Sequence, residues 1–157
     1  MEPSFFHGEY LIVDEFSYNF SEPKRGQVVV FRHPEPDCDD HISSNYINRK
    51  FFQGACSNYI KRVIGLPGET ITIKEGKVSV NGVILDESYI PKNIPTLGSQ
   101  TVTLAEDEFF VLGDNRNPNA SSDSREWGVL PRTHIVGKAL VILLPPQKFG
   151  FVEPIEY

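Results

Sequence analysis

The sequence has 157 residues, a length typical of a single domain. It carries 21 acidic and 15 basic residues, and the net charge of −6 argues against a nucleic-acid-binding protein held by a basic patch. The longest apolar run, Ala139–Leu144, is far shorter than the ~18–20 residues of a membrane span. The residues after Met1 have neither the basic start nor the apolar stretch of a signal peptide.

Apolar residues recur mainly with a period of two, which is the pattern of β-strands. The predicted strands are Tyr10–Val13, Gln27–Phe31, Asn58–Gly65, Thr70–Ile73, Lys77–Val80, Val83–Leu85, Thr101–Leu104, Phe109–Leu112 and Ile135–Leu144. Asn81-Gly82 lies between two of them and predicts a tight hairpin, because both central residues of a type I′ turn need a positive φ. No segment has a convincing amphipathic helical period. The sequence therefore predicts an all-β barrel or sandwich with few or no helices.

Lys61 lies inside the predicted strand 58–65. Because side chains alternate between the two faces of a strand, Lys61 shares its face with Tyr59 and Val63. One interpretation is a lysine at a sheet edge that prevents aggregation. The other is a desolvated lysine, since burial disfavours the ammonium form, lowers the pKa and lets the amine act as a general base near neutral pH. These residues alone leave both interpretations open.

Residues 113–125 follow an apolar strand and include two Asp, two Arg, three Asn and three Ser. Such a segment could be an ordinary solvated loop. Alternatively, bidentate Arg–carboxylate pairs could brace it as the support of a site on the neighbouring strand.

Four blocks of the chain, taken in this order, resemble the bacterial type I signal peptidases, which are serine–lysine endopeptidases. The blocks are Met1–Glu9, Arg25–Phe31, Tyr59–Glu69 and Gly113–Gly128. The third block matches the family's general-base motif almost residue for residue, and the fourth matches its Gly-Asp-Asn-Arg and Asp-Ser-Arg motifs. Met1 and Pro3 look like the end of the family's Ser-Met-x-Pro-Thr-Leu nucleophile motif. The resemblance implies one catalytic domain over residues 1–157, built of coiled, mostly antiparallel sheets.

The resemblance also implies roles for individual residues. Lys61 falls on the general base that takes the proton of the nucleophilic serine. Ser121 falls on a serine that orients the lysine amine, with its neighbour Ser122 as the alternative. Two pairs, Arg62 with Asp114 and Asp123 with Arg125, match ion pairs that support the site. The remaining motif residues of this block are Gly113, Asn115, Arg116 and Ser124.

Two features of the sequence depart from the family pattern, the length of one loop and one substitution. Six residues, Asn117–Ser122, separate the Gly-Asp-Asn-Arg and Asp-Ser-Arg motifs, where the family usually has four. Gln27 replaces the acidic residue of the family's Arg-Gly-Asp block. We expect the second change to cost little, because that block is mainly structural.

The nucleophile of the family motif would lie immediately before Met1. Ser4 is no substitute, because it occupies the Thr position after the Pro of the motif. We expect the reading frame to begin at an internal Met, so that a Ser codon adjoins Met1 and an apolar anchor of ~20 residues lies further upstream. The alternative is a polypeptide that begins at Met1 and is inactive. In either case we expect these 157 residues alone to be inactive.

The resemblance implies a substrate class and a location. The family cleaves the signal peptides of secreted preproteins after small residues, in an Ala-x-Ala-like pattern, and binds them as an added strand. Candidates for the pocket lining are Phe5, Phe6, Val13 and Tyr59, although Phe5 and Phe6 could instead reach the membrane surface or belong to the core. We expect a monomer at the cytoplasmic membrane, with the catalytic domain on the extracytoplasmic side. We expect no cofactor, no metal ion and no nucleic acid.

Residues 34–57 are rich in Asp, Ser and Asn and are predicted to be a surface insertion or a loose hairpin. They contain the two cysteines of the chain, Cys38 and Cys56. These could be free thiols, or they could form a disulfide on the extracytoplasmic side, where such bonds persist.

Two other functions stay open at this level. A self-cleaving serine–lysine protease of the repressor type shares part of this β-fold, but it would need a DNA-binding domain that the sequence lacks. A non-catalytic β module that binds extended peptides would need no nucleophile.

Overall fold

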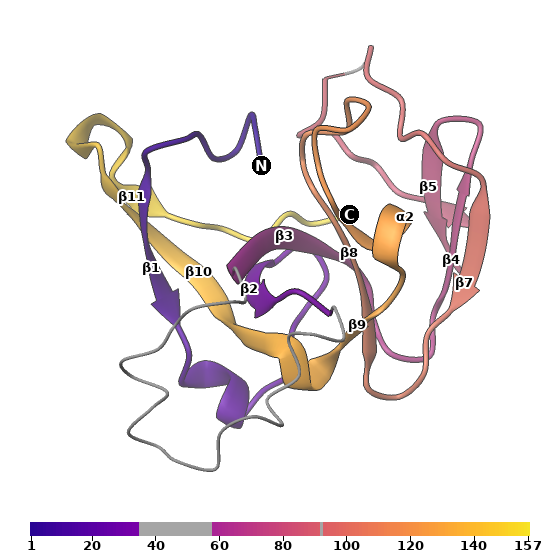
Figure 1. Ribbon diagram of the computed structural model, residues 1–157, viewed down its shortest axis with the longest axis horizontal. Helices are drawn as coiled ribbons and strands as arrows, with labels where there is room; N and C mark the ends of the chain where they lie inside the picture. The colour runs from indigo at the N-terminus through magenta and orange to yellow at the C-terminus, as the bar shows by residue number, and fades with distance from the viewer. Residues whose placement is uncertain (35–57, 92) are drawn as a thin grey trace.

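The computed structural model describes residues 1–34, 58–91 and 93–157, which form two antiparallel sheets (Figure 1). The predicted insertion at 34–57, with Cys38 and Cys56, lies outside the described residues except for Pro34. The prediction about the two cysteines therefore stays a prediction.

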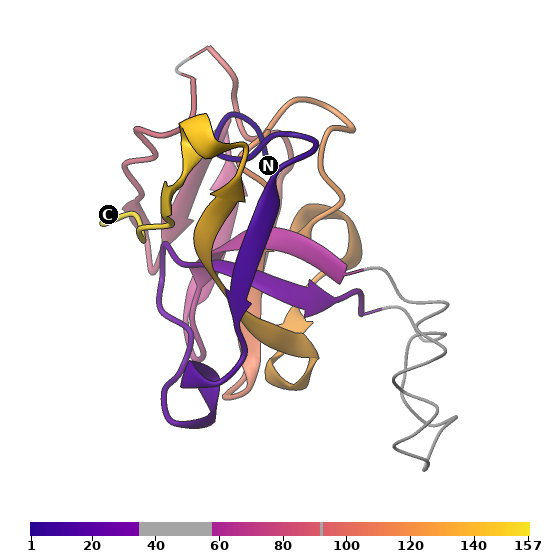
Figure 2. The same ribbon diagram turned by 90° about the vertical axis from the view of Figure 1, so that its left-hand side faces the viewer.

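The larger sheet has the strand order β1-β10-β2-β3-β8-β9, with β11 paired to β10. Its strands are β1 (Tyr10–Asp14), β10 (Ile135–Leu144), β2 (Val28–Arg32), β3 (Asn58–Gly65), β8 (Glu108–Leu112), β9 (Leu130–Pro131) and β11 (Gly150–Phe151). The sheet is strongly coiled, since β1 and β10 (indigo and gold) cross the direction of β2 and β3 (purple and magenta) in Figure 2.

The smaller sheet has the order β6-β5-β4-β7. Its strands are β6 (Val83–Ile84), β5 (Lys77–Val80), β4 (Thr70–Lys74) and β7 (Gln100–Thr103). The turn from β5 to β6 has φ of 51° at Asn81 and 82° at Gly82, which confirms the predicted hairpin. All pairings in both sheets are antiparallel, so the all-β prediction is confirmed.

Helices in the described part of the chain are short. They are α2 (Ser124–Trp127) and the 3-10 turns η1 (Ser17–Asn19), η3 (Arg132–His134) and η4 (Pro146–Lys148). Across residues 1–34, 58–91 and 93–157, none has the length and apolar character needed to cross a bilayer.

The core explains why β8 has a continuous apolar run and why β3 has adjacent apolar residues near its end. Phe109 and Val111 of β8 belong to one buried cluster, while Phe110 and Leu112 belong to a second cluster against the smaller sheet. On β3, the neighbouring residues Val63 and Ile64 divide between the same two clusters. Strands buried on both faces need apolar residues at consecutive positions. The strand that carries Lys61 is therefore held rigidly between two cores.

Gly137 of β10 provides a test of this packing. A Cβ at this position would lie 2.6 Å from the backbone oxygen of Asp14 on β1, whereas at Gly150 the nearest atom would be 3.9 Å away. We predict that Gly137→Ala lowers the free energy of unfolding by about 1–3 kcal/mol, because overpacking forces the backbone to shift. Gly150→Ala should change it by less than about 0.5 kcal/mol. Urea denaturation measures both, and equal stabilities of the two variants would contradict the packing described here.

Candidate active site

Lys61 is buried on β3, with 8% of its surface exposed. Its Nζ donates a hydrogen bond to the backbone oxygen of Ile60 at 3.0 Å and lies 5.5 Å from the centre of the Tyr59 ring. Burial lowers the pKa of Lys61, and the charges of Asp123 and Asp114 offset part of that decrease. The amine therefore loses its proton more easily than an exposed lysine, as a general base requires.

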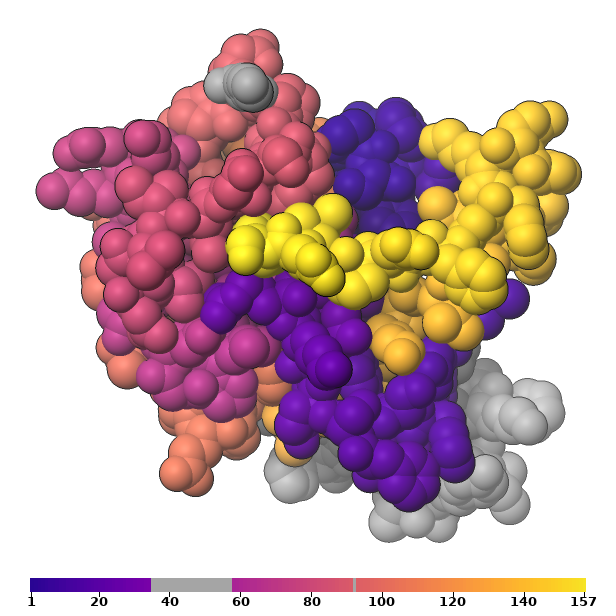
Figure 3. Space-filling model, turned by 180° about the vertical axis from the view of Figure 1, so that it is seen from behind, coloured from indigo at the N-terminus to yellow at the C-terminus, as the bar shows by residue number. Residues whose placement is uncertain are grey.

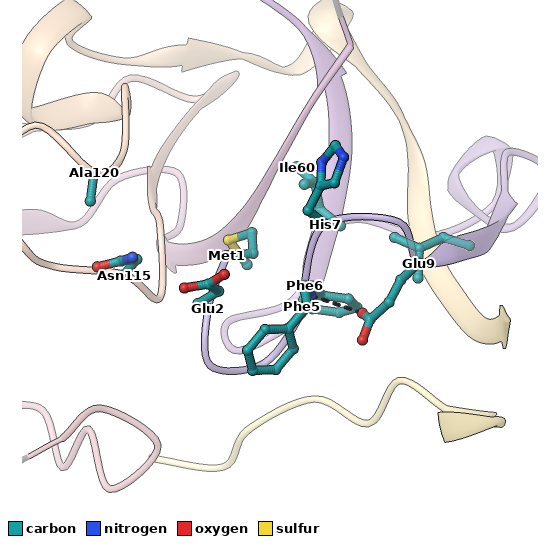
Figure 4. A pocket seen from close by; sticks show the side chains of 10 residues that line it. Met1, Glu2, Phe5, Phe6, His7, Glu9, Ile60, Asn115 and Ala120 are labelled. Atoms are coloured by element: carbon teal, nitrogen blue, oxygen red, sulfur yellow. Dashed lines mark hydrogen bonds between the residues drawn. The ribbon is translucent and has the colours of Figure 1, made fainter. Parts of the chain in front are cut away.

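The α-amino group of Met1 lies close enough to Lys61 for the two charges to interact. Its pKa is lowered by burial and by the positive charge of Lys61. Met1 also lines the cleft described below (Figure 4), so the start of the chain lies between that cleft and the charge of Lys61.

Arg62, the next residue on β3, forms a buried ion pair with Asp114. Its Nε and Nη2 donate to the two carboxylate oxygens at 2.9 and 2.6 Å, and its Nη1 donates to the backbone oxygen of Gly26 at 2.8 Å. The hydroxyl of Ser4 donates to the same carboxylate and accepts a bond from Arg62 Nη2 at 3.4 Å. Ser4 is thus bound to this ion pair and not to the Lys61 amine.

Asp123 and Arg125 form the second ion pair. Arg125 donates through Nε and Nη2 to the carboxylate of Asp123 at 2.8 and 2.9 Å. The same carboxylate accepts the backbone N–H of Gly113 at 3.0 Å and caps the start of α2 by accepting the N–H of Arg125. Ser124 Oγ accepts the N–H of Val111 on β8. These bonds fix the Asp-Ser-Arg turn against the end of β8.

Ser121 lies against Gly113, where a Cβ would come within 2.0 Å of its Oγ. The residue at 113 therefore has to be glycine. The Oγ of Ser121 is buried and has no hydrogen-bond partner among the described residues. The structure thus leaves this hydroxyl available for a hydrogen bond. The amine of Lys61, however, donates to Ile60 and not to Ser121.

Arg116 is fully buried. It donates to Glu87 through both Nη atoms, to Thr96 Oγ1 and to the backbone oxygen of Gly113. Arg116 therefore ties the Gly-Asp-Asn-Arg motif to the segment between β6 and β7. This role is structural.

Tyr89 is a residue of the site that sequence reasoning missed. The guanidinium of Arg62 lies over its ring, 4.8 Å from the centre, and its hydroxyl contacts Glu87, Arg116 and Tyr157. Its segment has no periodic pattern and lies outside all four motif blocks, so the sequence contained no signal for it.

A cleft of about 450 Å³ opens beside β3 (Figure 4). Its lining residues are Met1, Glu2, Phe5, Phe6, His7, Glu9, Leu11, Ile60, Asn115 and Ala120. Lys148 contacts two of these lining residues. Its Nζ pairs with Glu9 at 2.6 Å and lies 3.7 Å from the centre of the Phe6 ring.

Two of the four predicted pocket residues do not line this cleft. Tyr59 packs on the first core cluster, 6.2 Å from the ring of Phe31. Val13 packs toward β10, where a Cβ on Gly137 would lie 2.8 Å from its Cγ1. The resemblance indicated a substrate pocket in this region but not which side chains line the cleft. Phe5 and Phe6 do line it, and Phe5 also belongs to a buried cluster with Val28 and Ala139.

No group of three or more His, Cys, Asp or Glu residues lies close enough to hold a metal ion in residues 1–34, 58–91 and 93–157.

A family model described as signal peptidase, peptidase S26, matches residues 1–144. The chain belongs to the signal peptidase S26 family. A probable signal peptidase I-2 of Synechocystis sp. is 37% identical over 97% of this chain and 62% of its own length. A signal peptidase I of Leptolyngbya laminosa is 38% identical over 98% of this chain and 69% of its own length. The chain thus spans about two thirds of the length of these two relatives.

A solved structure agrees with this assignment. The crystal structure of a signal peptidase I from Enterococcus faecalis matches 75% of this chain and 97% of its own chain, with a TM-score of 0.53 and 28% sequence identity. The signal peptidase-like fold predicted from the four motif blocks is therefore confirmed.

The charges around Lys61 predict the direction of its titration. We expect the pKa of Lys61 to lie below that of ordinary lysines. Asp123→Asn should lower it further, because the substitution removes a negative charge that raises the pKa of Lys61. Glu75→Gln, in the turn between β4 and β5, should leave it unchanged. Nitrogen-detected NMR titration of lysine amines measures the pKa of Lys61 in the unmodified chain and in both variants. A Lys61 that titrates like the exposed lysines would contradict the burial described here.

Proposed function

We propose that the protein is a serine endopeptidase that removes signal peptides from secreted preproteins, with Lys61 as its general base. The observation that carries the proposal is the buried amine of Lys61, whose pKa is lowered by burial, on the strand that also carries the cleft residue Ile60. Membership of the signal peptidase family supports the same activity.

The proposed reaction is acyl transfer through a serine–lysine dyad. In the family motif the serine directly precedes the residue that Met1 matches, and here the α-amino group of Met1 is close to Lys61. The neutral amine accepts the hydroxyl proton as the serine oxygen attacks the peptide carbonyl. It then returns this proton to the leaving amine, and water hydrolyses the acyl-enzyme. Arg62, Asp114, Asp123 and Arg125 support the site and transfer no proton in this mechanism.

The cleft supports an extended peptide with small side chains near the bond that is cut. Met1, Phe5, Leu11 and Ile60 give the cleft apolar walls, and Ala120 leaves room opposite. A peptide that binds as an added strand gains backbone hydrogen bonds, while its alternate side chains enter shallow pockets. We propose that residues such as Ala fit in this cleft.

A membrane surface is the second proposed partner. Phe149 and Phe151 are 65% and 73% exposed, and Figure 1 shows β11 at the same end of β1 as the N-terminus. With Tyr10 and Phe6 they place exposed aromatic rings near the cleft, and aromatic residues favour the membrane–water interface. This arrangement suits an enzyme that acts at the membrane.

Replacing Lys61 tests the proposed activity. The assay uses the chain with a serine placed directly before Met1, acting in detergent on a purified preprotein with an Ala-x-Ala site. Lys61→Met should reduce the cleavage rate by at least ~10²-fold, because the general base is lost while the apolar stem is kept. The exposed Lys77→Met is the matched control and should cleave normally.

Three results would contradict the proposal. Equal cleavage by the Lys61→Met variant would remove Lys61 from the mechanism. Binding of the preprotein without any cleavage would favour the β module. Cutting of the chain itself would favour a self-cleaving protease.

Substitution of exposed aromatic residues tests the membrane proposal. The double variant Phe149→Ser with Phe151→Ser should lose most of its co-sedimentation with vesicles of bacterial phospholipids, because apolar area is lost from the bound face. Phe16 and Phe20 are 71% and 79% exposed and lie at η1, toward the other end of β1. Their double Ser variant is the matched control and should bind normally. Equal loss in both variants would contradict a specific membrane-binding face.

A further inference from the structure

The last three residues, Ile155–Tyr157, cross the back of the molecule (Figure 3). In that view the yellow C-terminal chain runs over purple residues toward the pink segment between β6 and β7. Ile155 N donates to the backbone oxygen of Gly26 at 3.3 Å. The hydroxyls of Tyr157 and Tyr89 are hydrogen-bonded at 2.8 Å. We call Ile155–Tyr157 the strap.

The two residues that the strap contacts, Gly26 and Tyr89, also contact Arg62. The backbone oxygen of Gly26 accepts a hydrogen bond from Arg62 Nη1 as well as from Ile155. The ring of Tyr89 lies against the Arg62 guanidinium, and the ring of Tyr157 meets that of Tyr89 edge-on, with 6.1 Å between centres. Arg62 contacts Gly26 and Tyr89 in addition to Asp114 and Ser4, and the strap contacts both Gly26 and Tyr89.

Gly26 shows that this crossing is closely fitted. Its φ is +84°, and a Cβ at this position would lie 1.9 Å from the backbone oxygen of Ile155. No side chain can occupy this position while the strap lies across it. The glycine of the Arg-Gly block is therefore needed for two reasons. It allows the turn before β2, and it leaves room for the backbone of the strap.

We propose that the strap is a positioning element that holds the Arg62 guanidinium against Asp114, directly behind Lys61. The inference deepens the proposed function and rests on it for its effect on activity. The strap touches neither the cleft nor Lys61, so its residues are positioning residues and not catalytic ones.

The effect at Lys61 follows from the charges that face it. These charged groups are Asp114, Asp123, Arg125 and the α-amino group of Met1. The carboxylate of Asp114 raises the pKa of Lys61. If Arg62 moves away from Asp114, that carboxylate is less neutralised and Lys61 keeps its proton to a higher pH. Burial raises the pKa of Tyr157 to about 12, so its hydroxyl stays protonated while Lys61 titrates.

The first experiment follows the Lys61 amine by nitrogen-detected NMR in the 157-residue chain, and it needs no activity. Tyr157→Leu should move the Lys61 titration midpoint to higher pH. Tyr157→Phe keeps the ring contact and loses only the hydrogen bond, so it should give a smaller shift in the same direction. Glu153→Gln, an exposed residue before the strap, should give none.

A general loss of stability is separated from positioning by Ile73→Val. Ile73 lies in the core cluster of the smaller sheet, so this variant should unfold at a lower temperature without moving the Lys61 midpoint. If Tyr157→Leu does not fold, Tyr157→Phe decides. An unmoved midpoint in a folded strap variant would overturn the inference.

The second experiment measures preprotein cleavage with a serine placed before Met1. Tyr157→Leu should lower kcat with KM unchanged. In the pH profile of kcat/KM, the rise on the acidic side should shift to higher pH together with the Lys61 titration midpoint. A shifted midpoint in a chain without cleavage supports the strap and contradicts the proposed function. Normal cleavage with an unshifted midpoint supports the proposed function and overturns the strap.

Discussion

The burial of two adjacent cations on β3 is the constraint on which the rest of the site depends. Lys61 and Arg62 point to opposite faces of a strand that is packed between two apolar clusters. Removing a charge from water costs several kcal/mol, so each cation needs a partner or has to lose its proton. The protein solves this problem differently for the two residues.

Arg62 remains charged because guanidinium does not titrate in proteins. It is accordingly paired with Asp114 and supported by Gly26 and Tyr89. Among the described residues, Lys61 has no carboxylate within hydrogen-bond distance, and its amine donates to the backbone oxygen of Ile60. A charged Lys61 is therefore poorly stabilised. This asymmetry gives the site an amine with a lowered pKa on one face and a fixed scaffold on the other.

Sequence reasoning identified the long strands and the hairpin at Asn81-Gly82, because strand periodicity and turn residues are local signals. It missed β9, β11 and α2, which have two, two and four residues and are too short for a periodic pattern. The motif resemblance placed both ion pairs correctly. Tyr89 and the strap were not predictable, because their contacts join positions far apart in the chain. The roles of Lys61 and Ser121 stay predictions.

The most direct test of the account is to detect the acyl-enzyme. The chain with a serine before Met1 is mixed with a peptide ester that ends in Ala, quenched rapidly and weighed by mass spectrometry over a range of pH. The account predicts an adduct on the added serine whose rate of formation rises with pH along the Lys61 titration curve measured by NMR. An adduct that forms at the same rate in Lys61→Met, or independently of that curve, would contradict it.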